Sequence, residues 1–388
     1  MRPDLDHGYA PDEPRTHTTD TPRITAESLS VSPTRRTFLT TVALGVGAVS
    51  GCLGSNRSDD YRSVTYRHRF DRSGIGSAVY DGGVELGSWE AHELDVEFKI
   101  SSGSRAAAQS VDGGQDDFAN AEIAAVLSLI DAGAPLTILA QETTPMGGVI
   151  TLRETGISSW TDLAGVEVGR FPWGVTGQLA EAAITSEGGD PNAVEWRNVE
   201  PGAHIQLLLE GAIDGAVAYY PQAVTRLELA GHETQVLPLG TVLDHLGNAL
   251  ITRQEIVDEH PEVVERFVRG WLDAHDTFIS RTDDVIDVHR DLVPNFDETV
   301  EREVLPLILA SRIAPETDLE SGMGWTPIER MTNTLDILEQ IDMLSSADTP
   351  ETYFTNRFIE ESQDRAIDIA ERYAQTLEQD YDIEPTAV

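Results

Sequence analysis

The chain has 388 residues, enough for two lobes with a sizeable core, and its net charge of −40 comes from 67 acidic and 27 basic residues. A surface this acidic repels nucleic acid and anionic membranes, which excludes both as direct partners. Lys99 is the only lysine. This favours a halophilic protein over a generally acidic mesophilic one, because concentrated salt screens the repulsion between acidic side chains: the Debye length is about 3 Å at 1 M salt.

The first 61 residues have the features of an export signal and a tether. Residues 1–33 are polar and rich in Pro, Thr and Asp, which is typical of a disordered segment or an over-long gene start. Arg35 and Arg36 match the twin-arginine export pattern, and the apolar run 38–49 is too short to span a bilayer. The run ends at Gly51-Cys52, a lipobox pattern that predicts lipidation of Cys52, the only cysteine. Residues 34–52 are therefore the predicted signal, 53–61 the tether, and a lipid the only membrane contact.

A first lobe is predicted over residues 62–147. Strands and helices alternate there, which is the pattern of a mostly parallel sheet. The expected strands cover 64–70, 94–100, 117–120 and 136–141, and the expected helices lie between them, at 78–90, after 105 and at 121–132. The turns that follow these strands contain glycine, serine and arginine.

A second lobe is predicted over residues 148–243. A strand at 148–153 precedes a short helix within 156–165, capped by Ser158 or Ser159. The strand 166–171 runs into a glycine turn before a helix at 178–187, whose free N–H groups would attract an anion or a carbonyl oxygen. A later strand ends at Tyr219, Tyr220 and Pro221, and ligands of open α/β sheets bind at such strand ends.

Beyond residue 243 we expect the chain to return to the first lobe. A strand at 248–252 is followed by helices at 262–277, 326–344 and 360–381. Their apolar side chains recur at helical spacing, which favours core packing over a cofactor site. The predicted fold class is α/β, with two lobes, mostly parallel sheets and a helical C-terminal extension covering 244–388.

Several segments occur in the order found in one family of transport proteins. These are 94–97, 131–136, 156–165, 174–177, 210–216 and 260–264. Together they resemble the periplasmic solute-binding proteins of nitrate, sulfonate, taurine and thiamin-precursor ABC importers. The resemblance implies a periplasmic-binding-protein-like fold of type II and capture of a small polar or anionic solute outside the cell. It also implies delivery to ABC permease and ATPase subunits by a protein that acts as a monomer. Together with the composition and the lipobox, this predicts a haloarchaeal lipoprotein on the extracellular face of the cytoplasmic membrane.

The turns at strand ends supply the candidate ligand-binding residues. They are Arg72, Ser73, Gly74, Ser102, Arg105, Asn120, Trp173, Gly174, Val175, Thr176, Tyr219, Tyr220 and Asn248. The two arginines could pair with an acidic ligand or with surface carboxylates. Trp173, Tyr219 and Tyr220 could cover a ligand or simply be buried near the hinge.

The sequence offers no pattern for catalysis. Gly74-Ile75-Gly76 lacks the third glycine of a dinucleotide fingerprint, and phosphate-loop, nucleophile-elbow and metal-spaced histidine motifs are absent. We therefore expect no cofactor, no metal and no enzymatic activity. Two alternatives stay open: a pyrimidine-precursor synthase or binder, whose cysteine-rich motif is missing, and a membrane-tethered sensor without transport. The segment 70–73 also lacks the Trp-x-Pro opening of the thiamin-precursor binders, which argues against a pyrimidine ligand.

Overall fold

The computed structural model describes residues 63–172, 175–200 and 202–384, which belong to one compact unit covering Asn56–Val388. The export and lipidation residues Arg35, Arg36 and Cys52 lie outside the described residues, as do the tether, Trp173 and Gly174. Within the described ranges, every helix is too short or too polar to cross a membrane.

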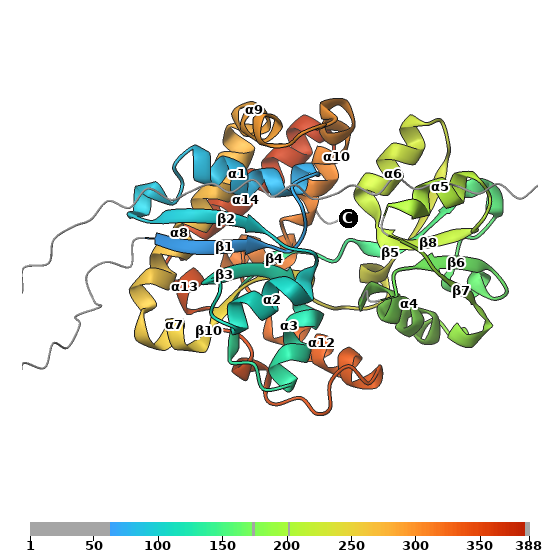
Figure 1. The fold of residues 1–388 in the computed structure, drawn as a ribbon, viewed down its shortest axis with the longest axis horizontal. Coiled ribbons are helices and arrows are strands. Elements are labelled where there is room, and N and C mark those ends of the chain that lie inside the picture. Colours follow the sequence, from blue (N-terminus) through green and yellow to red (C-terminus); the bar gives the residue numbers. More distant parts are fainter. Residues whose placement is uncertain (1–62, 173–174, 201, 385–388) are drawn as a thin grey trace, which may run out of the picture. The chain divides into compact units, whose positions relative to one another are not determined.

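The first sheet has the strand order β2-β1-β3-β10-β4 (Figure 1). Its strands are β1 (Ser63–His68), β2 (Asp95–Ile100), β3 (Phe118–Glu122), β4 (Leu136–Thr143) and β10 (Asn248–Arg253). β1 pairs in parallel with β2 and β3, whereas β10 is antiparallel to both β3 and β4. One strand thus runs against the other four.

The second sheet repeats this plan with the order β7-β6-β8-β5-β9. Its strands are β5 (Gly147–Leu152), β6 (Glu167–Arg170), β7 (Glu195–Asn198), β8 (Gly215–Tyr219) and β9 (Thr234–Pro238). β6 pairs in parallel with β7 and β8, and β5 is antiparallel to β8 and β9. In both sheets four strands of five share a direction, so the predicted fold class is confirmed.

The two antiparallel strands lie where the chain passes between the sheets. The chain goes from β4 to β5 through residues 144–146 and returns from β9 to β10 through η6 (Leu239–Thr241). β10 is inserted between β3 and β4. Because β10 is antiparallel to them, its first residue lies at the edge where β3 and β4 end.

Helices follow most of the strands and make up the C-terminal part of the chain. They are α1 (Ala78–Glu85), α2 (Ser104–Asp112), α3 (Ile123–Asp131), α4 (Val175–Ser186), α5 (Ala203–Leu209), α6 (Tyr220–Leu229), α7 (Gln254–Glu259), α8 (Pro261–Ser280), α9 (Thr282–Leu292), α10 (Glu298–Ser311), α11 (Pro315–Ser321), α12 (Ile328–Gln340), α13 (Arg357–Glu360) and α14 (Gln363–Tyr381). Short 3-10 turns include η1 (Ile75–Ser77) and η4 (Trp160–Leu163), and Ser159 and Asp162 form a capping box at η4.

α8 anchors the core of the first lobe, by which we mean the first sheet and the helices packed on it. The Phe267 ring stacks on Phe118 of β3 with ring centroids 3.8 Å apart, and Trp271 is fully buried. Burying an aromatic side chain of this size contributes about 1.5–3 kcal/mol. The predicted core role of the apolar stripe on this helix is confirmed.

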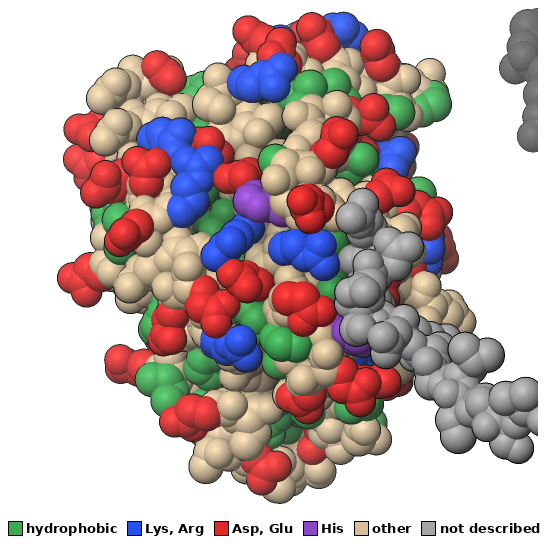
Figure 2. All heavy atoms as spheres, turned by 90° about the vertical axis from the view of Figure 1, so that its left-hand side faces the viewer, with side chains coloured by type: hydrophobic (Ala, Val, Ile, Leu, Met, Phe, Trp, Pro, Cys, Tyr) green, Lys and Arg blue, Asp and Glu red, His purple; other side chains and the backbone are tan. Residues whose placement is uncertain are grey.

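The charged surface is a mixture of the two signs. On the face drawn in Figure 2, acidic side chains are spread among the arginines rather than gathered in one patch. Lys99 on β2 lies 3.2 Å from both Glu97 and Asp116. On this face the negative charge is therefore distributed rather than concentrated in a single docking patch.

Candidate functional site

The carboxyl ends of β1, β3 and β4 and the start of β10 share one edge of the first sheet. Asn248, the first residue of β10, lies opposite Glu122 of β3 and Thr143 of β4. Its side-chain amide donates to Thr143 Oγ1 at 2.6 Å. Polar side chains from three strands therefore meet where an open α/β sheet binds its ligand.

A buried polar network lies next to this edge of the first sheet. Arg312 Nη1 donates to Glu142 Oε1 at 2.6 Å and to Tyr80 Oη at 3.0 Å, and Asn120 Nδ2 donates to the same two atoms at 3.0 and 3.1 Å. All four residues are buried. Asn120 Oδ1 accepts the backbone N–H of Arg69 at 2.9 Å. The network thus fixes the backbone just after β1.

Arg69 is the residue that this network holds in place. It is half-buried, and its buried Nη1 has no hydrogen-bond partner in the part of the chain that the structure describes. Its neighbours in sequence are paired: Arg67 Nε lies 2.7 Å from Asp116, and Arg72 Nε lies 3.2 Å from Asp81. Among the described residues no carboxylate oxygen lies within 4.0 Å of the Arg69 guanidinium. The guanidinium carbon lies 5.6 Å from the centroid of the Phe70 ring, and a partly desolvated cation of this kind, with no ion-pair partner among the described residues, is able to bind an anion.

Glu122 places a carboxylate at the end of the neighbouring strand. It is half-buried, and within the described chain its side chain has no hydrogen-bond or ion-pair partner. Burial raises the pKa of this carboxyl, and the positive charge of Arg69 partly opposes the increase. The charges of Arg69 and Glu122 therefore interact, although their charged atoms are more than 4.0 Å apart and form no ion pair.

The strand ends of the second sheet bring another group of residues together. Tyr219 ends β8 and is 36% exposed, whereas Tyr220 is buried. Gly147 pairs with Tyr219, and a methyl group at Gly147 would lie 2.7 Å from the Thr176 side chain. The side chains of Thr176 and Tyr219 therefore flank the same glycine at the start of β5.

One histidine lies close to these strand ends. His204 packs edge-on against Phe171, with ring centroids 5.7 Å apart, and its Nδ1 is buried without a partner in the described residues. Burial, and then the charge of Arg226, lower the pKa of His204. Its imidazole is neutral at pH 7, so it can exchange hydrogen bonds with a ligand but adds no positive charge.

The predicted site residues differ in where they lie in the fold and in how far they are exposed. Asn120 and Asn248 lie on central strands of the first sheet, Val175 and Thr176 begin α4, and Gly74 comes directly before η1. Ser102 and Arg105 are exposed beyond β2, the outer strand. Ser73 is exposed and donates its N–H to Asp71, and Arg72 pairs with Asp81 while its guanidinium lies 4.9 Å from the Phe98 ring centroid.

The sequence did not single out Arg69 or Glu122. Alternation over 64–70 put Arg69 on the outer side of β1, and the predicted helix at 121–132 absorbed Glu122. The structure instead extends β3 to Glu122 and starts α3 at Ile123. A charged residue between a fully buried strand and a buried helix was the signal that could have marked this position.

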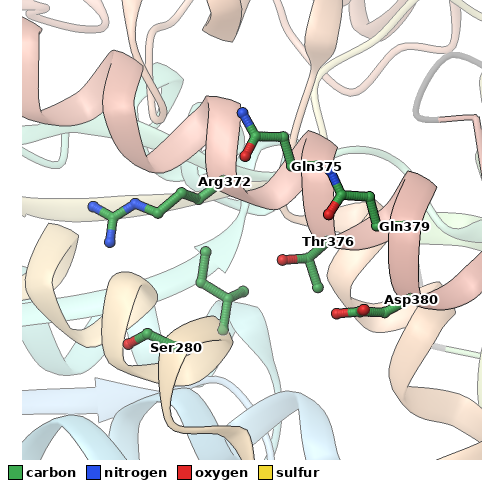
Figure 3. A pocket seen from close by; sticks show the side chains of 7 residues that line it. Ser280, Arg372, Gln375, Thr376, Gln379 and Asp380 are labelled. Atoms are coloured by element: carbon green, nitrogen blue, oxygen red, sulfur yellow. The ribbon is translucent and has the colours of Figure 1, made fainter.

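The pockets on the surface lie elsewhere. One of about 150 Å³ is lined by residues of α8 and α14, with Ser280 on the first helix and Arg372, Thr376 and Gln379 on the second (Figure 3). Its only cation, Arg372, already pairs with Asp276 and Asp368. A second hollow is bounded by residues 152–154 and 231–233. Neither pocket includes a predicted site residue, and no metal-binding group of three or more His, Cys, Asp or Glu exists in the described ranges.

The family follows from a comparison with known proteins. The model of the family described as NMT1/THI5 like matches residues 83–284, which is more than half of the 388-residue chain. The chain belongs to this family.

Individual relatives are distant from this protein. A binding protein of Brucella abortus (strain 2308), named without a ligand, is 25% identical over 219 residues, covering 55% of this chain and 66% of the relative, just under two thirds of its length. The riboflavin-binding protein RibY of Chloroflexus aurantiacus is 24% identical over 39% of this chain and 44% of its own. The taurine-binding periplasmic protein of Escherichia coli (strain K12) is 28% identical over 39% of this chain and 50% of its own.

Solved structures show the same fold. The periplasmic aliphatic sulphonate binding protein SsuA from Escherichia coli superimposes with a TM-score of 0.59 at 12% identity, covering 76% of this chain and 92% of that one. At such low identity the similarity shows the fold alone. The ligand has to be inferred from the residues of this chain.

Proposed function

We propose that this protein captures a small anionic solute outside the cell and delivers it to an ABC permease and its ATPase. The observation that carries the proposal is the unpaired, half-buried guanidinium of Arg69 at the strand ends of the first sheet. In a chain with 67 acidic residues, a partly buried arginine that pairs with none of the described carboxylates is unusual. An anionic ligand would supply the ion-pair partner that this arginine lacks among the described residues.

Binding in this proposal is closure of the two lobes on the ligand, and no bond is made or broken. Arg69 would hold the anionic group by charge-assisted hydrogen bonds. Asn248 lies on the same edge, and the first turn of α4, with Thr176 and Tyr219 beside it, would supply amides and an apolar cover from the second sheet. Trp173 and Gly174 stay predicted members of this group.

Compartment and anchoring are part of the same proposal. The twin-arginine pattern at Arg35 and Arg36 would export the folded chain, and a lipid on Cys52 would hold it at the extracellular face of the membrane as a monomer. Replacing both arginines by lysine should block export, which cell fractionation would measure. The acidic composition suits a haloarchaeal environment.

Three arginine variants test the site. Protein purified in high salt should release an organic anion on unfolding, detectable by mass spectrometry, and calorimetry should measure its rebinding. Arg69→Met should weaken binding about 10- to 100-fold, because a charge-assisted hydrogen bond contributes about 1.5–3 kcal/mol. Arg72→Met should lower stability rather than affinity, because it leaves the buried Asp81 without its arginine. Arg105→Met, at an exposed position, should change neither.

Two results would contradict the proposal. Loss of affinity in Arg72→Met or Arg105→Met with native binding in Arg69→Met would put the anion elsewhere. Turnover of any bound compound by the purified protein would replace the transport function with an enzymatic one.

A further inference from the structure

Two helices touch each other at a place where the chain does not cross between the lobes. α6 is packed into the core of the second lobe, by which we mean the second sheet and the helices on it, through Ala223 and Leu227. α10 is packed into the core of the first lobe through Val304 and Ile308. The two helices nevertheless contact each other. Because neither crossing segment passes through this contact, it can form and separate as the lobes move on their hinges.

An ion pair lies in the contact between α6 and α10. Arg226 Nη2 of α6 is 3.9 Å from Glu301 Oε1 of α10, and in the described ranges Arg226 is the one cation paired with this carboxylate. The Glu301 side chain is 2% exposed, whereas that of Arg226 is 51% exposed. The anion is therefore almost completely removed from water, while its partner is loosely placed and still hydrated.

The second oxygen of Glu301 holds a turn next to the candidate site. Oε2 accepts the backbone N–H of Ile75 at 2.8 Å, at the start of η1. This turn follows the loop that runs from Arg69 to Gly74. A methyl group on Gly74 would lie 3.0 Å from Gln222 Nε2 of α6 and 3.8 Å from Glu301 Oε2. The second lobe thus covers both the turn and the carboxylate that holds it.

The charge of Glu301 is costly in this position. Burial raises the pKa of the carboxyl, and it outweighs the opposite effects of the Ile75 N–H, Arg226 and His289; the charge of Asp297 raises the pKa further. A raised pKa means that the charged form is less stable here than in water. Separating α6 from α10 would admit water to the carboxylate and relieve that cost. The charge therefore favours the arrangement in which the lobes are apart.

We propose that Glu301 is a positioning residue that keeps the ligand-free lobes apart. Its buried charge opposes the closed arrangement, in which α6 lies on α10, and Arg226 limits this opposition to a size that a bound solute can overcome. A protein that stays open when empty keeps its site accessible, and only the loaded form then takes the closed shape. This inference concerns the movement of the lobes and goes beyond the proposed function, because it holds whatever the solute is.

The test measures the distance between the lobes in protein without solute. In a Cys52→Ser chain, which has no other cysteine, Leu229→Cys on α6 and Leu292→Cys on α9 supply two exposed positions for spin labels. Exhaustive dialysis in high salt at neutral pH removes bound solute, and double electron–electron resonance then gives the populations of short and long distances. Glu301→Gln keeps an oxygen for the Ile75 N–H and removes the charge.

Two substitutions should move the populations in opposite directions. Glu301→Gln should increase the ratio of short to long distances about 5-fold or more, the usual size of a coupling between two parts of a protein, because the closed arrangement no longer buries a charge. Arg226→Gln should decrease the ratio, because the buried carboxylate then lacks its cation. In the double variant Arg226→Gln should have no further effect, since no charge remains for it to pair with. Glu303→Gln, at an exposed carboxylate on the same helix, is the matched control and should leave the ratio unchanged.

Each outcome decides one part of the inference. An unchanged or decreased ratio in Glu301→Gln, with a urea midpoint that shows a folded protein, would overturn it. An effect of Arg226→Gln that persists in the double variant would overturn the role of the charge. If Glu301→Gln does not fold, Arg226→Gln at its exposed position still decides the matter, because an increased or unchanged ratio contradicts the proposal. None of these results depends on solute binding, so failure of the proposed function is detected separately by mass spectrometry and calorimetry.

Discussion

The ion pair between Arg312 and Glu142 should be among the most costly to break in the molecule. Their side chains are 3% and 0% exposed, with Arg312 Nη1 2.6 Å from Glu142 Oε1. Glu142 Oε2 has no partner among the described residues, and Arg312 is the one cation among them that pairs with this carboxylate, whose Oε1 also accepts hydrogen bonds from Asn120 and Tyr80. Arg312→Met leaves that charge buried and unpaired, and we expect a loss of about 3–5 kcal/mol in the free energy of unfolding.

Urea unfolding followed by tryptophan fluorescence measures this loss, because Trp89 and Trp271 are buried in the same lobe. A double-mutant cycle with Glu142→Gln should show a double variant whose loss is smaller than the sum of the two single losses by about 1–3 kcal/mol. Arg269→Met is the control. It breaks an exposed pair with Glu265 on one helix and should cost about 0.3–0.5 kcal/mol.

Salt provides a further check. The loss in Arg312→Met should persist when the salt concentration is raised, because a buried pair is screened much less than an exposed one. A loss below about 1 kcal/mol, or a double variant whose loss equals the sum of the singles, would refute the reasoning, since the buried charge would then be compensated by something else.

Three other sets of variants and conditions give independent tests. Gly270→Ala should destabilise the protein by about 1–3 kcal/mol in urea unfolding despite its better helix propensity, because the added methyl would lie 2.2 Å from the Trp89 ring. Burial raises the pKa of Asp318 to about 8, so its contribution to stability is full below the unfolded pKa near 4 and is lost as pH rises through about 8. The urea concentration at the unfolding midpoint should therefore decrease as pH is raised from about 5 to 8. Asp318→Asn should remove the part of this decrease that comes from Asp318. Cys52→Ser should release the protein from membrane fractions, and unchanged membrane association would exclude the lipid anchor.

The sequence predicted the elements whose residues carry a local signal. The stripe that includes Phe267 and Trp271 predicted α8, and the serine-aspartate spacing predicted a cap at Ser158 or Ser159, which the structure places at Ser159. β7 was missed because three of its four residues are exposed, so the strand lacks an apolar face. Nothing local marks a strand of that kind, whose pairing with β6 depends on residues distant in the chain.

The site was harder to predict than the fold because its key contacts join distant segments. Arg72 was selected because it lies in the turn after the first strand, yet its guanidinium pairs with Asp81 of α1, the helix that follows this turn. Asn120 was selected as a ligand group, and its amide is occupied by the Arg69 backbone, Tyr80 and Glu142. Whether a polar side chain is free for a ligand depends on such partners, which only the three-dimensional structure brings together.

The insertion of β10 between β3 and β4 has a consequence for biosynthesis. Asn248 bonds with Thr143, 105 residues earlier in the chain, so the first sheet cannot close until the whole second sheet has left the ribosome. At about 5–20 residues per second, β3 and β4 wait roughly 5–20 s with the ladder edges that β10 will occupy still unpaired. Unpaired strand edges can pair with other chains. Nascent molecules on neighbouring ribosomes are therefore at risk of aggregating with one another during that interval.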